Sequence, residues 1–82
     1  MSVTIDDNEI AMCVRKSLEI YFQTLDGEKP CPIYEMVINS VEKPLLETAM
    51  HYANGNQSRA AQLLGINRNT LRSRLLKHQL IK

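Results

Sequence analysis

The chain has 82 residues, enough for one small domain, and a domain of this size buries so little apolar surface that we expect a second chain to complete its core. Its composition is 44% hydrophobic with few aromatics and three glycines, which favours an all-α fold. The net charge of +1 is divided unevenly: residues 1–47 hold all nine acids and carry −5, whereas residues 48–82 carry +6, so we expect the C-terminal part to face a polyanion.

The first predicted element is a helix over residues 9–25. Apolar side chains recur along it every three or four positions, at Ile10, Val14, Leu18, Tyr21 and Leu25. Asp7 or Asn8 can cap its start, and Gly27 can end it. Residues 28–32 contain two prolines, which remove backbone donors and restrain their neighbours, so this segment is predicted to be a linker.

A second, longer helix is predicted from about Pro32 to Ala53. Its buried side should carry Ile33, Val37, Val41, Leu45 and Tyr52. Pro44 falls inside this helix, and because the apolar period continues on both sides we expect a kink rather than a stop. The helix should end at three residues that tolerate the left-handed conformation, Asn54, Gly55 and Asn56.

These two helices carry more apolar side chains than one antiparallel pair can cover, including Met12, Met36, Ile38 and Met50. We therefore expect residues 9–53 to form a homodimer, with residues 1–8 as a short flexible tail. The alternative is that the methionines only fill an intramolecular core. A chain with no apolar run of about 20 residues and no signal peptide is expected to be cytoplasmic, with Cys13 and Cys31 reduced and buried.

Residues 57–77 have the pattern of two short helices joined by a tight turn. Two alanines let the helices cross closely, Ala60 and Ala61, and Gly65 supplies the positive φ of the turn. Each helix is preceded by an asparagine that can cap it, Asn56 and Asn67. The shared apolar seam is predicted to comprise Leu63, Leu64, Ile66, Leu71 and Leu75. Residues 54–82 are therefore predicted to form a helix-turn-helix unit.

The second helix of this unit leaves polar and cationic residues outside the apolar seam, namely Arg68, Asn69, Arg72 and Lys77, with Arg74 near its edge. This is the arrangement of a recognition helix in the DNA major groove. Asn67 and Arg68 stand at its N-terminal end, where arginine can pair with guanine and asparagine with adenine. A basic amphipathic helix at a membrane or on an acidic protein is the alternative, but neither needs two alanines and a glycine at these offsets.

Four runs of the sequence resemble the Fis family, named after the factor for inversion stimulation: residues 34–37, 41–47, 55–61 and 65–72. The resemblance extends over roughly Val14 to Lys77. It implies four helices per chain, an intertwined homodimer of the first two helices, and a C-terminal helix-turn-helix. It also implies a nucleoid-associated regulator of transcription, recombination or replication. Recognition helices in a Fis-like dimer stand closer than the about 34 Å between successive turns of straight B-DNA, so the bound DNA should bend.

The resemblance assigns roles to residues of this chain. Asn67 and Arg68 match the family's base-reading pair, and its backbone contacts match Asn56, Ser58, Arg59, Thr70, Arg72, Arg74 and Lys77. Ser73 and Leu76 stand where Fis usually has lysines, so the cationic footprint is thinner. The stretch of residues 1–8 has no room for the mobile β-hairpin that contacts recombinases in better-known members.

Other assignments remain open. The same motif closes the C-terminal domain of nitrogen-regulator-type enhancer-binding proteins, although Met1 and a helix starting at residue 9 favour a free-standing protein. From another class, a protein-interaction module could contact RNA polymerase through residues 54–57, a turn next to one that does so in Fis. We expect no enzyme and no cofactor, since His51 and His78 belong to no catalytic arrangement. We expect no metal either, because the cysteines and histidines are spaced too widely for a zinc finger.

Overall fold

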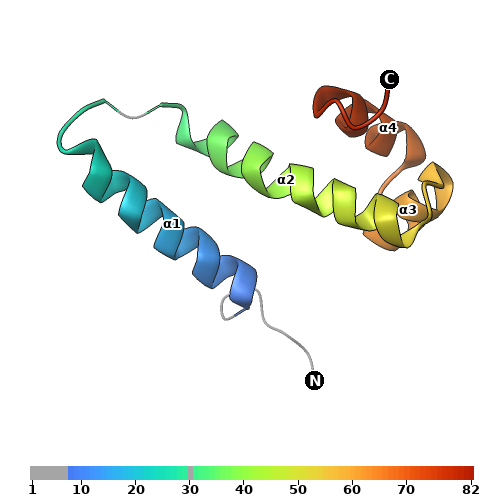
Figure 1. Ribbon diagram of the computed structural model, residues 1–82, viewed down its shortest axis with the longest axis horizontal. Helices are drawn as coiled ribbons and strands as arrows, with labels where there is room; N and C mark the ends of the chain where they lie inside the picture. The colour runs from blue at the N-terminus through green and yellow to red at the C-terminus, as the bar shows by residue number, and fades with distance from the viewer. Residues whose placement is uncertain (1–7, 30) are drawn as a thin grey trace. The chain divides into compact units, whose positions relative to one another are not determined.

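The computed structural model describes residues 8–29 and 31–82 (Figure 1). Within them the chain forms four helices and no strand: α1 at Glu9–Leu25, α2 at Ile33–Tyr52, α3 at Gln57–Leu64 and α4 at Arg68–Lys77. The predicted all-α fold is therefore confirmed. None of the described helices is both long and apolar enough to span a membrane. The predicted tail falls almost wholly outside the described residues, as does Asp7, one of the two expected caps.

The ends of α1 follow from local hydrogen bonds and backbone conformation. The Asn8 side chain caps the helix by accepting a hydrogen bond from the Ala11 amide at 2.7 Å. The helix ends at Leu25, as predicted, and is followed by two residues with positive φ, Asp26 at 49° and Gly27 at 85°. After this turn, the Cys31 amide donates to the Tyr21 hydroxyl at 3.1 Å, which ties the linker to α1.

The structure corrects the predicted burial in this part of the chain. Cys13 and Cys31, expected to be buried, are both exposed. On α1 the face comprising Val14, Leu18, Tyr21 and Leu25 is half-buried as expected, but Ile10 is exposed and Ala11 takes its place. The reason is the helical repeat. Ala11 precedes Leu18 by two turns and so lies on the same face, whereas Ile10 is rotated by about 100° from Ala11 around the helix axis.

α2 begins at Ile33, one residue later than predicted, with the Pro32 carbonyl accepting from the Met36 amide at 3.1 Å. It continues through Pro44, which does not end the helix, as expected, while the kink expected there remains a prediction. Asn54 and Gly55, both with positive φ, follow its end. The chain divides into two compact units, of which the first ends at Val37 and the second is Ile38–Lys82. The predicted separation of dimerisation and DNA-binding functions at residue 54 remains a prediction.

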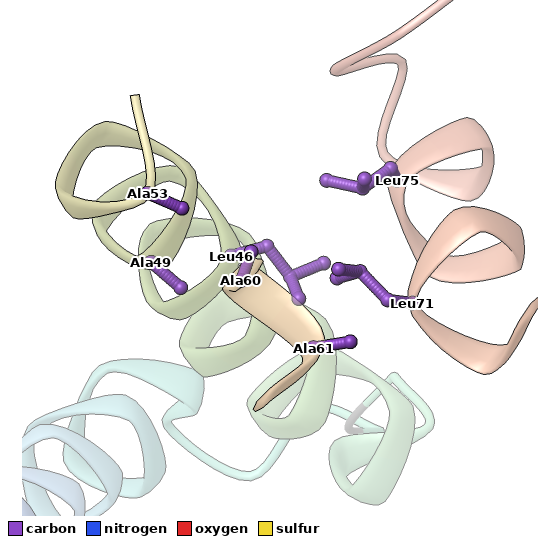
Figure 2. Packing of buried hydrophobic residues seen from close by; sticks show 7 residues of the cluster. All are labelled: Leu46, Ala49, Ala53, Ala60, Ala61, Leu71 and Leu75. Carbon is purple, nitrogen blue, oxygen red and sulfur yellow. The ribbon is translucent and has the colours of Figure 1, made fainter. Parts of the chain in front are cut away.

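The core of the second unit joins the end of α2 to α3 and α4. Figure 2 shows its seven buried side chains, Leu46, Ala49, Ala53, Ala60, Ala61, Leu71 and Leu75. Four of the seven are alanines, from the end of α2 and from α3, and the two α4 leucines supply the large side chains that are fully buried. Partly buried side chains surround this cluster, namely Met50, Leu64, Leu80 and Ile81.

The predicted buried side of α2 is wrong for this unit. Val41, Leu45 and Tyr52 are exposed, and the side that meets α3 and α4 carries Leu46, Ala49 and Ala53 instead. α2 therefore has two apolar faces, since Leu45 and Leu46 are separated by about 100° around the helix axis. Met50 packs against the intramolecular core, as the alternative interpretation of the methionines proposed, whereas Met12 is exposed.

Candidate nucleic-acid interface

The helix-turn-helix begins at an asparagine cap, as predicted. The Asn56 side-chain oxygen accepts a hydrogen bond from the Arg59 amide at 3.1 Å, which satisfies a donor that the first turn of α3 would leave unpaired. The first turn of α3 also carries Ser58, and the side chains of Asn56, Ser58 and Arg59 are all exposed. The capping interaction thus fixes where three of the predicted backbone-binding residues stand.

The turn between α3 and α4 depends on Gly65. Its φ is 72°, and its amide donates to the Gln62 carbonyl at 3.2 Å, while the Ile66 amide donates to the Ala61 carbonyl at 3.0 Å. A Cβ added at Gly65 would meet nothing within 4 Å, so glycine is required by the backbone conformation and not by crowding. This confirms the role predicted for Gly65.

α4 begins at a second asparagine cap, also as predicted. The Asn67 side-chain oxygen accepts from the Asn69 amide at 2.7 Å, and Arg68 is the first residue of the helix. Because the oxygen of Asn67 is engaged in capping, its side-chain nitrogen is the group most available to a ligand. Neither Arg68 nor Arg72 makes an ion pair with any residue that the structure describes.

α4 is held to the domain through one face only. Leu71 and Leu75 lie one turn apart and are completely buried against the core (Figure 2). Two members of the predicted seam do not belong to it: Leu63 and Ile66 are exposed, and the side of α3 that enters the core carries Ala60 and Ala61 instead. The seam within the protomer is therefore narrower than predicted.

The structure brings all nine predicted site residues into the second unit, and every one of them is exposed. The first turn of α3 supplies Asn56, Ser58 and Arg59, and α4 with its cap supplies Asn67, Arg68, Thr70, Arg72, Arg74 and Lys77. Together with Asn69, which is also exposed, they form a set of four arginines, one lysine and five uncharged hydrogen-bonding side chains. Such a set is suited to binding a polyanion. No group of three or more potential metal ligands occurs among the described residues.

Sequence reasoning missed two residues that fix the far end of α4. The His78 imidazole lies with its Nε2 2.6 Å from the Glu42 carboxylate oxygen Oε1, and their side chains are only 8% and 18% exposed. The hydrogen bond from His78 is the main cause that lowers the pKa of Glu42 below its usual 4.5, with smaller contributions from Arg74 and Lys77. The carboxylate is therefore ionised at neutral pH and can only accept, so Nε2 is the donor.

A signal for this pair was present in the sequence. Glu42 precedes Leu46 by one helical turn, and His78, the residue that follows α4, comes three residues after Leu75, so both are expected on the side of the buried leucines. A titratable side chain in such a position usually has a partner when it is buried. The two residues are 36 positions apart, and only the packing of α4 on α2 shows that they meet.

Comparison with known proteins agrees with this architecture. The family model described as bacterial regulatory protein, Fis family, matches residues 38–78. A protein of Ralstonia nicotianae named as a Fis-like DNA-binding protein is 54% identical over 74 residues, covering 90% of this chain and 96% of its own length. A protein of Neisseria meningitidis serogroup A with the same name is 51% identical, covering 89% and 92% of the two chains.

The DNA-binding protein Fis of Actinobacillus succinogenes is 49% identical over 65 residues, which are 79% of this chain and 66% of that protein. The matched segments extend well beyond the helix-turn-helix and so include the region of the first two helices. By the family model and by these relatives, the chain belongs to the bacterial regulatory protein family Fis.

Proposed function

We propose that this chain is a DNA-binding transcriptional regulator that acts as a homodimer and places α4 in the major groove. The observation that carries the proposal is the exposed, cationic first turn of α4, seated by Leu71 and Leu75 and capped by Asn67. Its relatives are named as DNA-binding proteins. Relatives that are 54% and 49% identical are named as a Fis-like DNA-binding protein and as the DNA-binding protein Fis, which favours a Fis-type regulator over the C-terminal domain of an enhancer-binding protein.

In this proposal Arg68 and Asn67 read bases, and the other exposed residues bind the DNA backbone. Arg68 can donate two parallel hydrogen bonds to guanine O6 and N7, and the side-chain nitrogen of Asn67 can donate to a base acceptor. Phosphate contacts are assigned to Asn56, Ser58, Arg59, Thr70, Arg72, Arg74 and Lys77. Capped helix starts place amides and side chains together at a phosphate, as is common in such interfaces.

Salt-dependent binding to random duplex DNA tests this function directly. The logarithm of the affinity should fall linearly with the logarithm of the salt concentration, because the cationic side chains release counterions from the DNA. A protein-interaction module that contacts only other proteins would show no such binding. Failure of the folded protein to bind any duplex at low salt would therefore reject the proposal.

The proposal of a homodimer is supported by the exposed apolar face of α2, the one that contains Leu45. Its exposed side chains recur at helical spacing within the second unit, at Ile38, Val41, Leu45 and Tyr52. A contiguous exposed apolar face of this kind marks a protein interface, and a second copy of the same helix offers a matching surface. Sedimentation should find two chains per particle, whereas a stable folded monomer at low micromolar concentration would contradict the proposal.

DNA bending is part of the same proposal. If the dimer sets its two α4 helices closer than about 34 Å, straight DNA cannot present two successive major grooves to both of them. Flexible pyrimidine–purine steps and an A·T-rich centre should then be preferred, since they lower the cost of bending. Circular-permutation gel shifts should depend on the position of the site within the fragment, and a position-independent shift would exclude bending.

A contact with RNA polymerase is a finer proposal for the turn after α2. His51, Tyr52 and Asn54 are exposed there, and the rings of His51 and Tyr52 meet edge to face with centroids 5.5 Å apart. Asn54→Ala should reduce activation of a target promoter while leaving DNA affinity unchanged. Equal loss of both activities would instead indicate a contact with DNA. These assignments fit a protein that acts in the cytoplasm, bound to the nucleoid, and without enzymatic activity.

A further inference from the structure

Among the described residues, Glu42 of α2 is the one acidic group that pairs with α4, and three basic side chains near the end of α4 surround it. Besides His78, the Arg74 Nε atom lies 3.8 Å from Oε2, and the Lys77 Nζ atom lies 4.0 Å from Oε1. Arg74 and Lys77 are two of the residues proposed to bind DNA phosphates. Their side chains are 48% and 44% exposed, so they reach solvent while contacting the carboxylate.

The contacts of Glu42 are of two different kinds. The His78 hydrogen bond is short and mostly shielded from water, so it holds the end of α4 against α2. The contacts with Arg74 and Lys77 are long and exposed, and ion pairs of that kind are weak. The two cations can therefore leave the carboxylate while the hydrogen bond remains.

A carboxylate and a phosphate bind the same guanidinium and ammonium groups, so the two anions exclude one another at these side chains. Along α4 the competition is confined to one end, because Arg68 and Arg72 have no ion pair among the described residues.

We propose that Glu42 is an internal competitor of the DNA backbone, which holds Arg74 and Lys77 in the free protein and releases them to phosphates when DNA binds. This inference rests on the proposed DNA-binding function. It assigns to Glu42 a negative effect on affinity that is the same for every DNA sequence, because phosphates carry no sequence information. Its hydrogen bond with His78 keeps α4 in position in both states.

Glu42→Gln is the direct test, since glutamine keeps an oxygen that can accept from His78 but loses the charge. Glu47→Gln is the matched control: it makes the same charge change in α2, at an exposed residue with no ion pair to the described part of α4. Glu42→Gln should raise affinity for random duplex DNA about threefold to tenfold per dimer, in the range that exposed ion pairs produce. Glu47→Gln should raise it much less.

A double-mutant cycle separates competition from a general electrostatic effect. In the Arg74→Ala Lys77→Ala background, Glu42→Gln should give no further gain, because the side chains that it would release are absent. A gain that persists there, or one that Glu47→Gln matches, overturns the inference. If the wild type binds no duplex DNA at all, it is the proposed function that fails.

A measurement on the wild type makes the test independent of whether Glu42→Gln folds. On addition of random duplex DNA, the NMR signals of the Arg74 Nε–H and the Lys77 ammonium group should shift, while that of the His78 Nε2–H should stay near its position in the free protein. Signals of Arg74 and Lys77 that remain unchanged in a DNA complex would show that both stay with Glu42, which refutes the inference.

Discussion

Replacing Leu45 by alanine should weaken the dimer by an amount that follows from its exposure in a single chain. Leu45 is 51% exposed there, although it lies on an apolar face of α2. Full burial of a leucine contributes about 1.5 to 3 kcal/mol, so covering the remaining half contributes roughly 0.8 to 1.5 kcal/mol per protomer. Two-fold symmetry doubles this to about 1.5 to 3 kcal/mol, or roughly a tenfold to hundredfold change in the dissociation constant.

Sedimentation equilibrium over a range of protein concentrations measures that constant. Leu63→Ala is the control, because Leu63 is similarly exposed at 57% but lies in α3, outside the predicted dimerisation segment. It should leave the dimer dissociation constant unchanged. The reasoning fails if Leu45→Ala has no effect or if Leu63→Ala has an equal one. Leu45→Asp should be more severe and should unfold the protein as the dimer dissociates, since an uncompensated charge would be placed in an apolar interface.

Three further predictions concern α4 and its support. Arg68→Ala should cost about 1 to 3 kcal/mol of DNA-binding free energy per half-site and relax the preference for guanine. Lys77→Ala should weaken binding to all DNA sequences alike and lower the slope of log affinity against log salt by about one unit per lost phosphate contact. Selection of binding sites from a random DNA pool with Arg68→Ala would refute base reading if every base preference persisted. Leu71→Ala, at a completely buried residue, should lower the free energy of unfolding by about 2 to 5 kcal/mol in urea at fixed protein concentration, and a loss below about 1 kcal/mol would contradict the observed packing. The pKa of Glu42 is lowered from 4.5 in the folded protein, so its contribution to stability is present above that pH and is lost as the pH falls through the folded pKa. The free energy of unfolding of Glu42→Gln should therefore change less on acidification than that of the wild type. Parallel pH profiles of the two proteins would contradict this assignment.

Local signals in the sequence were sufficient for the helices of the second unit and for the exposure of the candidate site residues, whose roles remain predictions. Asn56 and Asn67 cap their helices and Gly65 adopts the positive φ of the turn, because each of these effects is decided within four residues along the chain. The cationic face of α4 could be predicted for a similar reason. Once Leu71 and Leu75 point inward, the helical pitch places Arg68 and Arg72 outside.

The tertiary structure decided which apolar residues meet within the protomer. Periodicity along α2 is satisfied by the face containing Leu45 and by the face containing Leu46, and a helix with two apolar faces has no local property that says which one meets α3. Within the protomer the face containing Leu46, Ala49 and Ala53 is the one buried in the common core with side chains of α3 and α4. The Glu42–His78 contact depends on the same packing: the attraction between two side chains 36 residues apart exists only after α4 is seated on α2.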